Sequence, residues 1–285
     1  MKEIKKVCVA GAGSMGRQIA LNAAMNGFVV KVRTSKIEQS ASWCRSFMEK
    51  GVSKGRYTES QMEETLNRLT FVSETKEAVH DADLVIESII EDEAVKREFF
   101  TEVNEYAPGD AIITTNSSYI ASSKFAELIS EPGRLANLHY FNPAMYMTLV
   151  EIVRGEHTAE ETVDTLKNFV SAVGKQAIVV KKEIEGFVVN RLLRAIQNEG
   201  FFLYENGIAS FEDIDIGAEK GLNHPMGPFR LVDLTGIDIC YMNRKAKYDR
   251  TGLPDDVPPA FLKEKFDKGE FGRKTGKGWY DYSEK

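Results

Sequence analysis

The stretch VCVAGAGSMGRQIA, residues 7–20, decides the fold class. In it the apolar run Val7–Ala10 is followed at once by the pattern GxGxxG, and the helical pattern Met15–Asn26 begins inside that turn. A glycine-rich turn between a buried strand and a helix is typical of the phosphate-binding start of a βαβ dinucleotide-binding unit. An ordinary glycine turn is the competing interpretation, and the flanking strand and helix argue against it.

Each residue of this turn has a physical role in the predicted unit. Gly11 permits the tight turn, Gly13 lets the backbone approach a pyrophosphate, and Gly16 lets the helix pack closely on the strand. Ser14 and Met15 begin a helix whose free N–H groups and positive dipole end attract phosphates. We therefore expect Gly11, Gly13, Ser14, Met15 and Gly16 to bind the phosphates of a dinucleotide cofactor.

Short apolar runs alternate with helical patterns up to about residue 180, which predicts a parallel sheet with helices on both faces. The helical character begins to dominate near Glu183. We predict an α/β chain in which a Rossmann-type doubly wound sheet (residues 1–183) precedes an all-α C-terminal domain (residues 184–285). The expected strands are Val7–Ala10, Val29–Val32, Leu84–Glu87, Ala111–Thr114 and Arg134–His139, and the expected helices include Met15–Asn26, Glu38–Lys50 and Glu93–Glu105.

Two segments carry expectations for the second domain. The segment Phe187–Phe202 is apolar almost all round, which predicts a buried helix. The closing FGRKTGKGWYDYSEK, residues 271–285, is rich in glycine and lysine, and we expect it to return over the surface.

The composition argues against several classes of function. A net charge of −6 argues against a nucleic-acid partner. The three cysteines and four histidines form no cluster with metal-ligand spacing, so we expect no metal and a reducing cytoplasmic location. The sequence contains no apolar run near ~18 residues, so we expect no membrane span. The N-terminal residues lack the features of a signal peptide.

The stretch VKVRTSK, residues 30–36, concerns the choice of nicotinamide cofactor. Folds that bind NAD place an acid ~20 residues beyond the glycine turn, where it binds the ribose hydroxyls. That position falls at Thr34, and no acid stands there. Arg33 and Lys36 would attract a 2′-phosphate, with Thr34 and Ser35 as neutral donors. We predict NADP, and NAD is the alternative if these cations are only solvated charges at a strand end.

A second group of motifs supplies candidates for chemistry. His139 ends an expected strand, at the sheet edge where such folds bind ligands, and can take up a proton near neutral pH. Glu151 follows at a distance that a hairpin can reverse, and its carboxylate would orient the ring. Ser117 and Asn190 offer uncharged donors to an alcohol or carbonyl oxygen. The alternative is structural, because a strand-end histidine and a buried amide are also ordinary core residues.

Taken together, the motifs make the whole chain resemble the L-3-hydroxyacyl-CoA dehydrogenase family, especially its short bacterial 3-hydroxybutyryl-CoA dehydrogenases. They are the glycine turn, ESIIEDEAVK, NSS, HYFNP, LVE, GFVVNRLL, HPMGPF and GRKTGKGWYDY. The resemblance implies a Rossmann domain followed by a helical domain through which the protein forms a homodimer. It also implies that Ser117, His139, Glu151 and Asn190 form the catalytic set, and that Glu91, Lys96, Asn142 and Lys274 contact the cofactor.

The implied function is hydride exchange between NADP or NAD and C3 of a (S)-3-hydroxyacyl-CoA, with 3-hydroxybutyryl-CoA as the expected substrate. In this hypothesis His139 takes the hydroxyl proton, Glu151 orients His139, and Ser117 and Asn190 position the substrate oxygens. Lys54 matches a family lysine that contacts coenzyme A, and a solvated helix end is an equal alternative.

Two other functions stay open at this point. One is dehydrogenation of a free hydroxy acid, as in carnitine or gulonate dehydrogenases, and the other is cofactor binding without catalysis. The motifs HPMGPF and GRKTGKGWYDY favour the acyl-CoA branch over the first, and the four catalytic residue types argue against the second.

Overall fold

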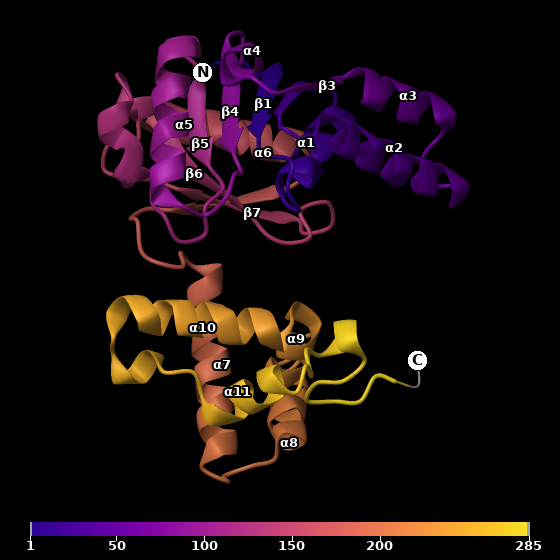
Figure 1. Cartoon of the computed structure of the whole chain (residues 1–285), viewed down its shortest axis with the longest axis vertical. Helices are drawn as coiled ribbons and strands as arrows, with labels where there is room; N and C mark the ends of the chain where they lie inside the picture. The colour runs from indigo at the N-terminus through magenta and orange to yellow at the C-terminus, as the bar shows by residue number, and fades with distance from the viewer. Residues whose placement is uncertain (1, 284–285) are drawn as a thin grey trace. The chain divides into compact units, whose positions relative to one another are not determined.

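The computed structural model describes residues 2–283, so Met1, Glu284 and Lys285, which the two predicted domains include, lie outside the described residues. The chain divides after Val188 into two compact units, a sheet-based first unit and a helical second unit (Figure 1).

The first unit is built on an eight-stranded sheet in the order β3-β2-β1-β4-β5-β6-β7-β8. Neighbouring strands pair in parallel, except β6 and β7, which are antiparallel. The strand order reverses between β1 and β4, and doubly wound sheets bind ligands at such a switch point. The strands are β1 (Lys6–Ala10), β2 (Val29–Arg33), β3 (Leu69–Val72), β4 (Leu84–Glu87), β5 (Ile112–Thr115), β6 (Leu135–Tyr140), β7 (Leu149–Val153) and β8 (Gln176–Val180).

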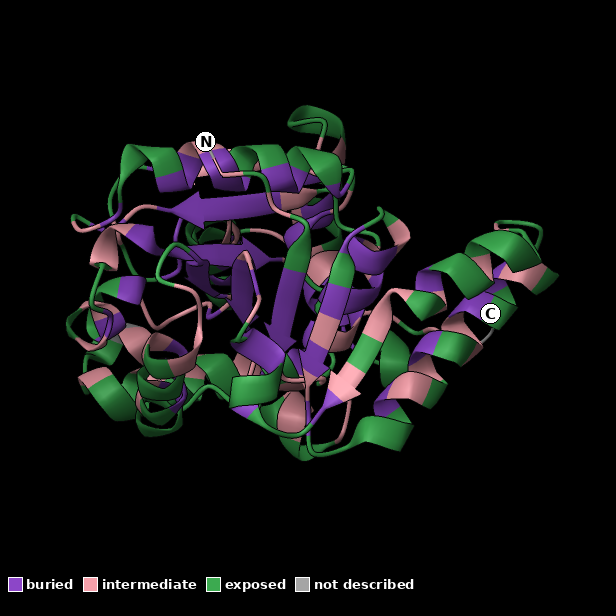
Figure 2. Cartoon of the chain, turned by 90° about the horizontal axis from the view of Figure 1, so that it is seen from above, coloured by how far each residue is buried: buried purple, intermediate pink, exposed green. Residues whose placement is uncertain are grey.

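Helices cover both faces of this sheet, because alternate side chains of a strand point to opposite faces. In β1, Val7 and Val9 pack in one apolar cluster with α1 and α6, whereas Cys8 and Ala10 pack in another with α4 and α5. Figure 2 shows the central strands as largely buried. The helices are α1 (Gly16–Met25), α2 (Ile37–Ser53), α3 (Glu59–Asn67), α4 (Thr75–Val79), α5 (Glu93–Tyr106) and α6 (Glu160–Ala172), with short 3₁₀ turns η1 (Ser122–Leu128) and η2 (Pro132–Arg134). The predicted fold class is confirmed.

The second unit is helical and has its own aromatic core. Phe201, Phe229, Val232, Leu262 and Trp279 are buried in one cluster. Its elements are α7 (Val189–Glu205), α8 (Phe211–Ile216), the π-helical η3 (Gly217–Gly221), α9 (Pro228–Thr235), α10 (Ile237–Thr251), η4 (Pro254–Asp256), α11 (Ala260–Asp267) and η5 (Arg273–Thr275).

The expectation that the closing segment runs over the surface is wrong for its middle. Trp279 is only 7% exposed and packs edge-on against Phe229, with ring centroids 4.5 Å apart. The buried carboxylate of Asp233 accepts hydrogen bonds from the N–H groups of Trp279 and Tyr280 and from the hydroxyl of Tyr282. A buried carboxylate needs such partners, and the closing segment supplies them.

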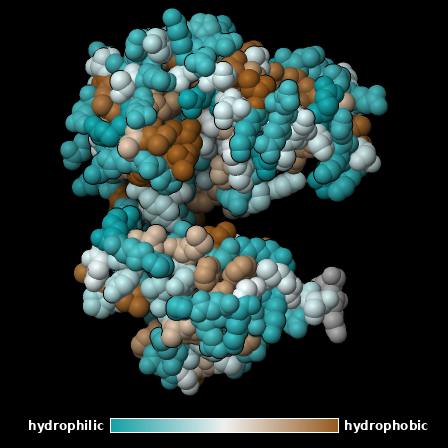
Figure 3. All heavy atoms as spheres, viewed as in Figure 1, coloured by the Kyte–Doolittle hydropathy of each residue, from teal (hydrophilic) through white to brown (hydrophobic). Residues whose placement is uncertain are grey.

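The helix α7 also differs from expectation, because it is not buried all round. Its buried residues are Gln197, Gly200 and Phe201, whereas Leu192 is 61% and Phe202 54% exposed. Figure 3 shows hydrophobic side chains among hydrophilic ones on the visible surface of the second unit. Within residues 2–283, no helix combines the length and apolar character that a bilayer crossing requires.

Candidate active site

His139 and Glu151 face each other across the antiparallel pair β6–β7. They are direct partners in the strand register, and His139 Nδ1 lies 2.8 Å from Glu151 Oε2. Both side chains are buried, and the imidazole also packs edge-on against Phe141 and Phe187. The second carboxylate oxygen of Glu151 accepts the N–H of Val188 at 3.0 Å. The pair is therefore held in one orientation by the sheet and by packing.

The hydroxyl of Ser118 lies 2.9 Å from His139 Nε2, the ring nitrogen opposite the one that meets Glu151. A carboxylate only accepts hydrogen bonds, so Nδ1 carries the proton and donates to Glu151. Nε2 then holds a lone pair and accepts the Ser118 O–H. This arrangement presents a basic nitrogen next to a hydroxyl, which is the geometry of a general base beside an alcohol.

The structure brings Ser118, and not Ser117, to His139. The Ser117 hydroxyl donates to a carboxylate oxygen of Glu91 and accepts the backbone N–H of Ile120 at 2.8 Å, so it holds the turn together. Successive residues in a turn point in different directions, and the sequence alone does not show which of two adjacent serines faces the sheet edge.

Two asparagines attach this turn to strand β6. The buried Asn137 accepts the N–H of Ser122 at 2.7 Å and donates to the carbonyl of Ile120 at 3.1 Å. Asn116 accepts the N–H of Tyr140 at 2.9 Å. The loop that carries Ser118 is thus fixed to the strand that carries His139.

A buried ion pair supports the same loop from strand β4. Glu87 ends β4, is 0% exposed, and accepts Lys96 Nζ at 2.6 Å and the Thr115 hydroxyl at 2.6 Å. Lys96 Nζ also lies 3.2 Å from Glu91, the partner of Ser117. The sequence analysis did not identify Glu87 as a site residue. An acidic residue at the end of the apolar run LVIE could have indicated it, because an acid in a buried strand needs a partner.

The start of helix α5 explains why Lys96 reaches the core. The side chain of Asp92 caps the helix by accepting the N–H groups of Ala94 and Val95. This cap sets the first turn, so that Lys96 points inward toward Glu87 while its neighbour Arg97 remains outside, in contact with Glu127.

The glycine turn forms one wall of a hollow of about 1100 Å³. Gly11 has φ +98, and a Cβ on Gly16 would lie 1.8 Å from the Gly11 carbonyl oxygen, so glycine is needed at both positions. A Cβ on Gly13 would meet nothing within 4 Å, because Gly13 borders open space. The residues that line the hollow are Gly11–Met15, Arg17, Arg33–Lys36, Gln39, Ser40, Ser88–Glu91, Lys96 and Asn116–Tyr119.

These residues fit a nicotinamide dinucleotide. The N–H groups of Ser14, Met15 and Gly16 donate to no protein acceptor within the described residues, and the first turn of α1 carries no acidic side chain. Free N–H groups at a helix N-terminus are suited to phosphate oxygens. The hollow also reaches Ser117 and Ser118 at the carboxyl ends of the strands, where such sheets bind their ligands.

The remaining predicted site residues lie in several places. Asn142 is exposed in the turn after β6, and Lys54 is exposed at the end of α2, outside the residues that line the hollow. Asn190 is the second residue of α7, and Lys274 lies in η5, where it pairs with Asp238; both belong to the second unit.

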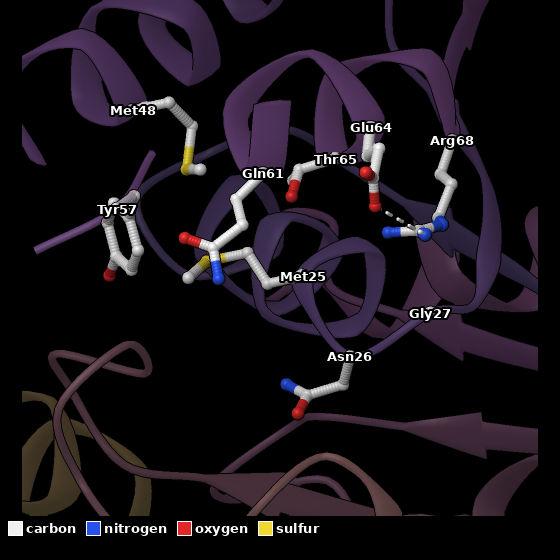
Figure 4. Close-up of a pocket in the computed structure, with 9 residues that line it drawn as sticks. All are labelled: Met25, Asn26, Gly27, Met48, Tyr57, Gln61, Glu64, Thr65 and Arg68. Carbon is white, nitrogen blue, oxygen red and sulfur yellow. Dashed lines mark ion pairs between the residues drawn. The ribbon is translucent and has the colours of Figure 1, made fainter. Parts of the chain in front are cut away.

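A separate hollow of about 520 Å³ lies among α1, α2 and α3 (Figure 4). It is lined by sulfur and polar side chains that include Met25, Met48 and Gln61, and by an ion pair between Glu64 and Arg68. Glu64 and Arg68 already neutralise each other, so this hollow offers no unpaired charge to a phosphate. The described residues contain no group of three or more side chains that could hold a metal ion.

Comparisons with known proteins agree along the whole chain. Residues 6–184 match the family model of the 3-hydroxyacyl-CoA dehydrogenase NAD binding domain, and residues 186–282 match that of the C-terminal domain. A probable 3-hydroxybutyryl-CoA dehydrogenase of Bacillus subtilis is 35% identical over 286 residues, which cover 99% of each chain. Human mitochondrial hydroxyacyl-coenzyme A dehydrogenase is 34% identical, covering 98% of this chain and 91% of the relative. The crystal structure of (S)-3-hydroxybutyryl-CoA dehydrogenase from Ralstonia eutropha has a TM-score of 0.87 at 32% identity, covering 99% of this chain and 100% of that one.

Proposed function

Since this chain belongs to the 3-hydroxyacyl-CoA dehydrogenase family, we propose that it interconverts (S)-3-hydroxybutyryl-CoA and acetoacetyl-CoA with a nicotinamide cofactor. The observation that carries this proposal is the hydrogen-bonded series Ser118–His139–Glu151, in which the buried pair His139–Glu151 meets the hydroxyl of Ser118, a residue that lines the cofactor hollow.

In the proposed mechanism His139 Nε2 takes the proton of the C3 hydroxyl. Glu151 is a positioning residue that keeps the proton of the free enzyme on Nδ1 and stabilises the imidazolium once it forms. Ser118 donates a hydrogen bond to the substrate oxygen, a role that the sequence had suggested for Ser117. The bound nicotinamide supplies the hydride acceptor for C3, and in reverse the hydride donor. In the direction of reduction, His139 returns its proton to the new alkoxide.

We propose NADP(H) as the preferred cofactor. Thr34, where an NAD-binding fold has its acid, is buried and neutral, and Arg33 and Lys36 flank it on the wall of the hollow. An acid at this position would repel a 2′-phosphate, whereas the two cations attract one.

Two further proposals concern coenzyme A and assembly. We assign Lys54 to binding of the coenzyme A part of the substrate, so Lys54→Ala should weaken competition by free coenzyme A without changing the affinity for the nicotinamide cofactor.

We assign the homodimer interface to the second unit. The exposed apolar side chains of Leu192, Ile196 and Phe202 on α7 support this assignment. A monomeric mass in sedimentation at micromolar concentration would contradict the dimer.

Steady-state kinetics test the proposed reaction. Acetoacetyl-CoA is reduced with NADPH and NADH in parallel, and free acetoacetate and the keto acids of carnitine and gulonate serve as rival substrates. We expect the highest kcat/KM with acetoacetyl-CoA, and a higher value with NADPH than with NADH. Turnover of the free acids alone would contradict the acyl-CoA assignment, and an NADH preference would contradict the cofactor assignment.

A further inference from the structure

The cofactor hollow carries three cations that no carboxylate neutralises. Arg17, Arg33 and Lys36 line it, and none of them forms an ion pair with a carboxylate in the part of the chain that the structure describes. The fourth cation of the hollow, Lys96, is different, because two glutamates already pair with it. Unpaired cations gathered in a concave site favour an anionic ligand.

Arg17 is supported by an aromatic ring. Its guanidinium carbon lies 4.3 Å from the ring centroid of Trp43 on helix α2, and Trp43 packs in turn against Phe47, with centroids 5.4 Å apart. Its Nε atom is buried without a hydrogen-bond partner. Stacking occupies one face of a guanidinium and leaves the N–H groups in its plane free to donate. The charge of Arg17 and the N–H groups in the plane of its guanidinium therefore remain available to an anionic ligand.

Arg33, the last residue of β2, also lies near an aromatic ring. Its guanidinium carbon lies 6.0 Å from the ring centroid of Phe99, and its Nε atom also lacks a partner. Its carbonyl accepts the N–H of Gly11 at 2.9 Å, which ties the end of β2 to the turn. Arg17 follows the last glycine of the same turn, Gly16, so the turn sets both arginines against one hollow.

We propose that Arg17, stacked on Trp43, acts with Arg33 as a clamp for a phosphate monoester, and that its ligand is the 2′-phosphate of NADP(H). The inference rests on the proposed function and adds Arg17 as a residue that determines cofactor specificity. The free N–H groups of the turn serve the pyrophosphate, so the arginines remain available for a further phosphate. A phosphate monoester carries three acceptor oxygens and close to two negative charges, which two guanidinium groups match.

Binding of two nucleotides that differ only in the 2′-phosphate tests the clamp without any turnover. Calorimetry with 2′,5′-ADP and 5′-AMP compares the wild type with Arg17→Gln. We expect the wild type to prefer 2′,5′-ADP, and Arg17→Gln to weaken 2′,5′-ADP about 10- to 100-fold while 5′-AMP changes less than about twofold. The control is Arg45→Gln, because Arg45 lies on α2 outside the hollow and pairs with Glu63.

Variants of Trp43 test the stacking separately. Trp43→Phe keeps an aromatic face and should bind 2′,5′-ADP nearly as the wild type does, whereas Trp43→Leu should lose about 2- to 30-fold. Circular dichroism checks that both variants fold. An equal loss for both nucleotides in Arg17→Gln, or no preference of the wild type for 2′,5′-ADP, would overturn the clamp. If the protein prefers 2′,5′-ADP but reduces no acyl-CoA, the result would support the clamp and contradict the proposed reaction.

Discussion

Glu151 Oε2 stands 2.8 Å from His139 Nδ1 because the two residues are direct partners across strands β6 and β7. The antiparallel pairing of these two strands, in a sheet that is otherwise parallel, places the carboxylate behind the imidazole. A parallel neighbour would have run in the same direction as β6, and the chain would have needed a long crossover connection to return to the start of that strand.

The first prediction concerns that carboxylate. In Glu151→Gln the amide can donate to Nδ1, which moves the ring proton to Nε2 and removes the lone pair that accepts the substrate proton. We expect kcat for (S)-3-hydroxybutyryl-CoA oxidation, the direction in which Nε2 accepts the proton, to fall by about two to four orders of magnitude with the Kd of NADP⁺ unchanged. Glu160→Gln, at an exposed glutamate that pairs with Arg154, is the control. Equal kcat values in Glu151→Gln and Glu160→Gln would show that Glu151 does not contribute to the mechanism.

The second prediction separates two adjacent serines. Ser118→Ala removes the hydroxyl at His139 Nε2 and should lower kcat about tenfold, the order of one hydrogen bond, while stability changes little. Ser117→Ala removes the turn contacts to Ile120 and Glu91 and should lower the free energy of unfolding by about 1–3 kcal/mol. Steady-state kinetics give kcat, and urea unfolding gives the stability, of both variants. If Ser117→Ala loses more kcat than Ser118→Ala, the roles are reversed.

The third prediction concerns the buried ion pair Glu87–Lys96. Lys96→Met leaves a buried carboxylate unpaired and should cost about 3–5 kcal/mol of unfolding free energy. The double variant Glu87→Gln, Lys96→Met should recover part of this loss. Arg97→Ala, at the neighbouring exposed pair with Glu127, should cost less than about 1 kcal/mol. A double variant less stable than Lys96→Met alone would show that charge imbalance is not the cause.

The fourth prediction concerns stability in mild acid. Burial holds the pKa of His157 below its ordinary value of 6.5, against the opposing pull of Glu183. The unfolded chain therefore binds the proton more readily, so the free energy of unfolding should fall as the pH drops below about 6.5. His157→Gln should flatten this dependence in urea unfolding between about pH 5 and 7.5. His80→Gln, at an exposed histidine, is the control, and an unchanged slope in His157→Gln would contradict the prediction.

Much of the fold was predictable because its elements carry strong local patterns. The five expected strands correspond to β1, β2, β4, β5 and β6, since their apolar runs are bounded by polar or glycine residues. Strand β3, LTFV, was missed because only one of its residues is buried and it follows a charged helix. Strands β7 and β8 were also not predicted as strands: β8 is only partly buried, whereas β7 is buried over most of its length. Weak burial accounts for the two missed strands at the edges of the sheet, β3 and β8, but not for the interior strand β7.

The residues of the candidate site were predictable where the residue type and its position in one strand were sufficient to identify them. His139 at the end of a strand and Glu151 on the next run were found from type and spacing. Ser118 was not chosen over Ser117, because the difference depends on backbone dihedrals in a turn. Trp43 was not connected with Arg17, because the contact joins two helices and appears only after they pack. Contacts of this kind depend on tertiary structure, which a single sequence pattern does not contain.

The measurement that bears on the whole mechanism is single-turnover reduction of acetoacetyl-CoA by His139→Gln, with NADPH at saturation. His139 is the only group assigned to proton transfer, so we expect the rate of the hydride step to fall by about 10²- to 10⁴-fold, with the Kd of NADPH and the unfolding midpoint close to those of the wild type. A hydride-transfer rate in His139→Gln equal to that of the wild type would show that the proton moves elsewhere.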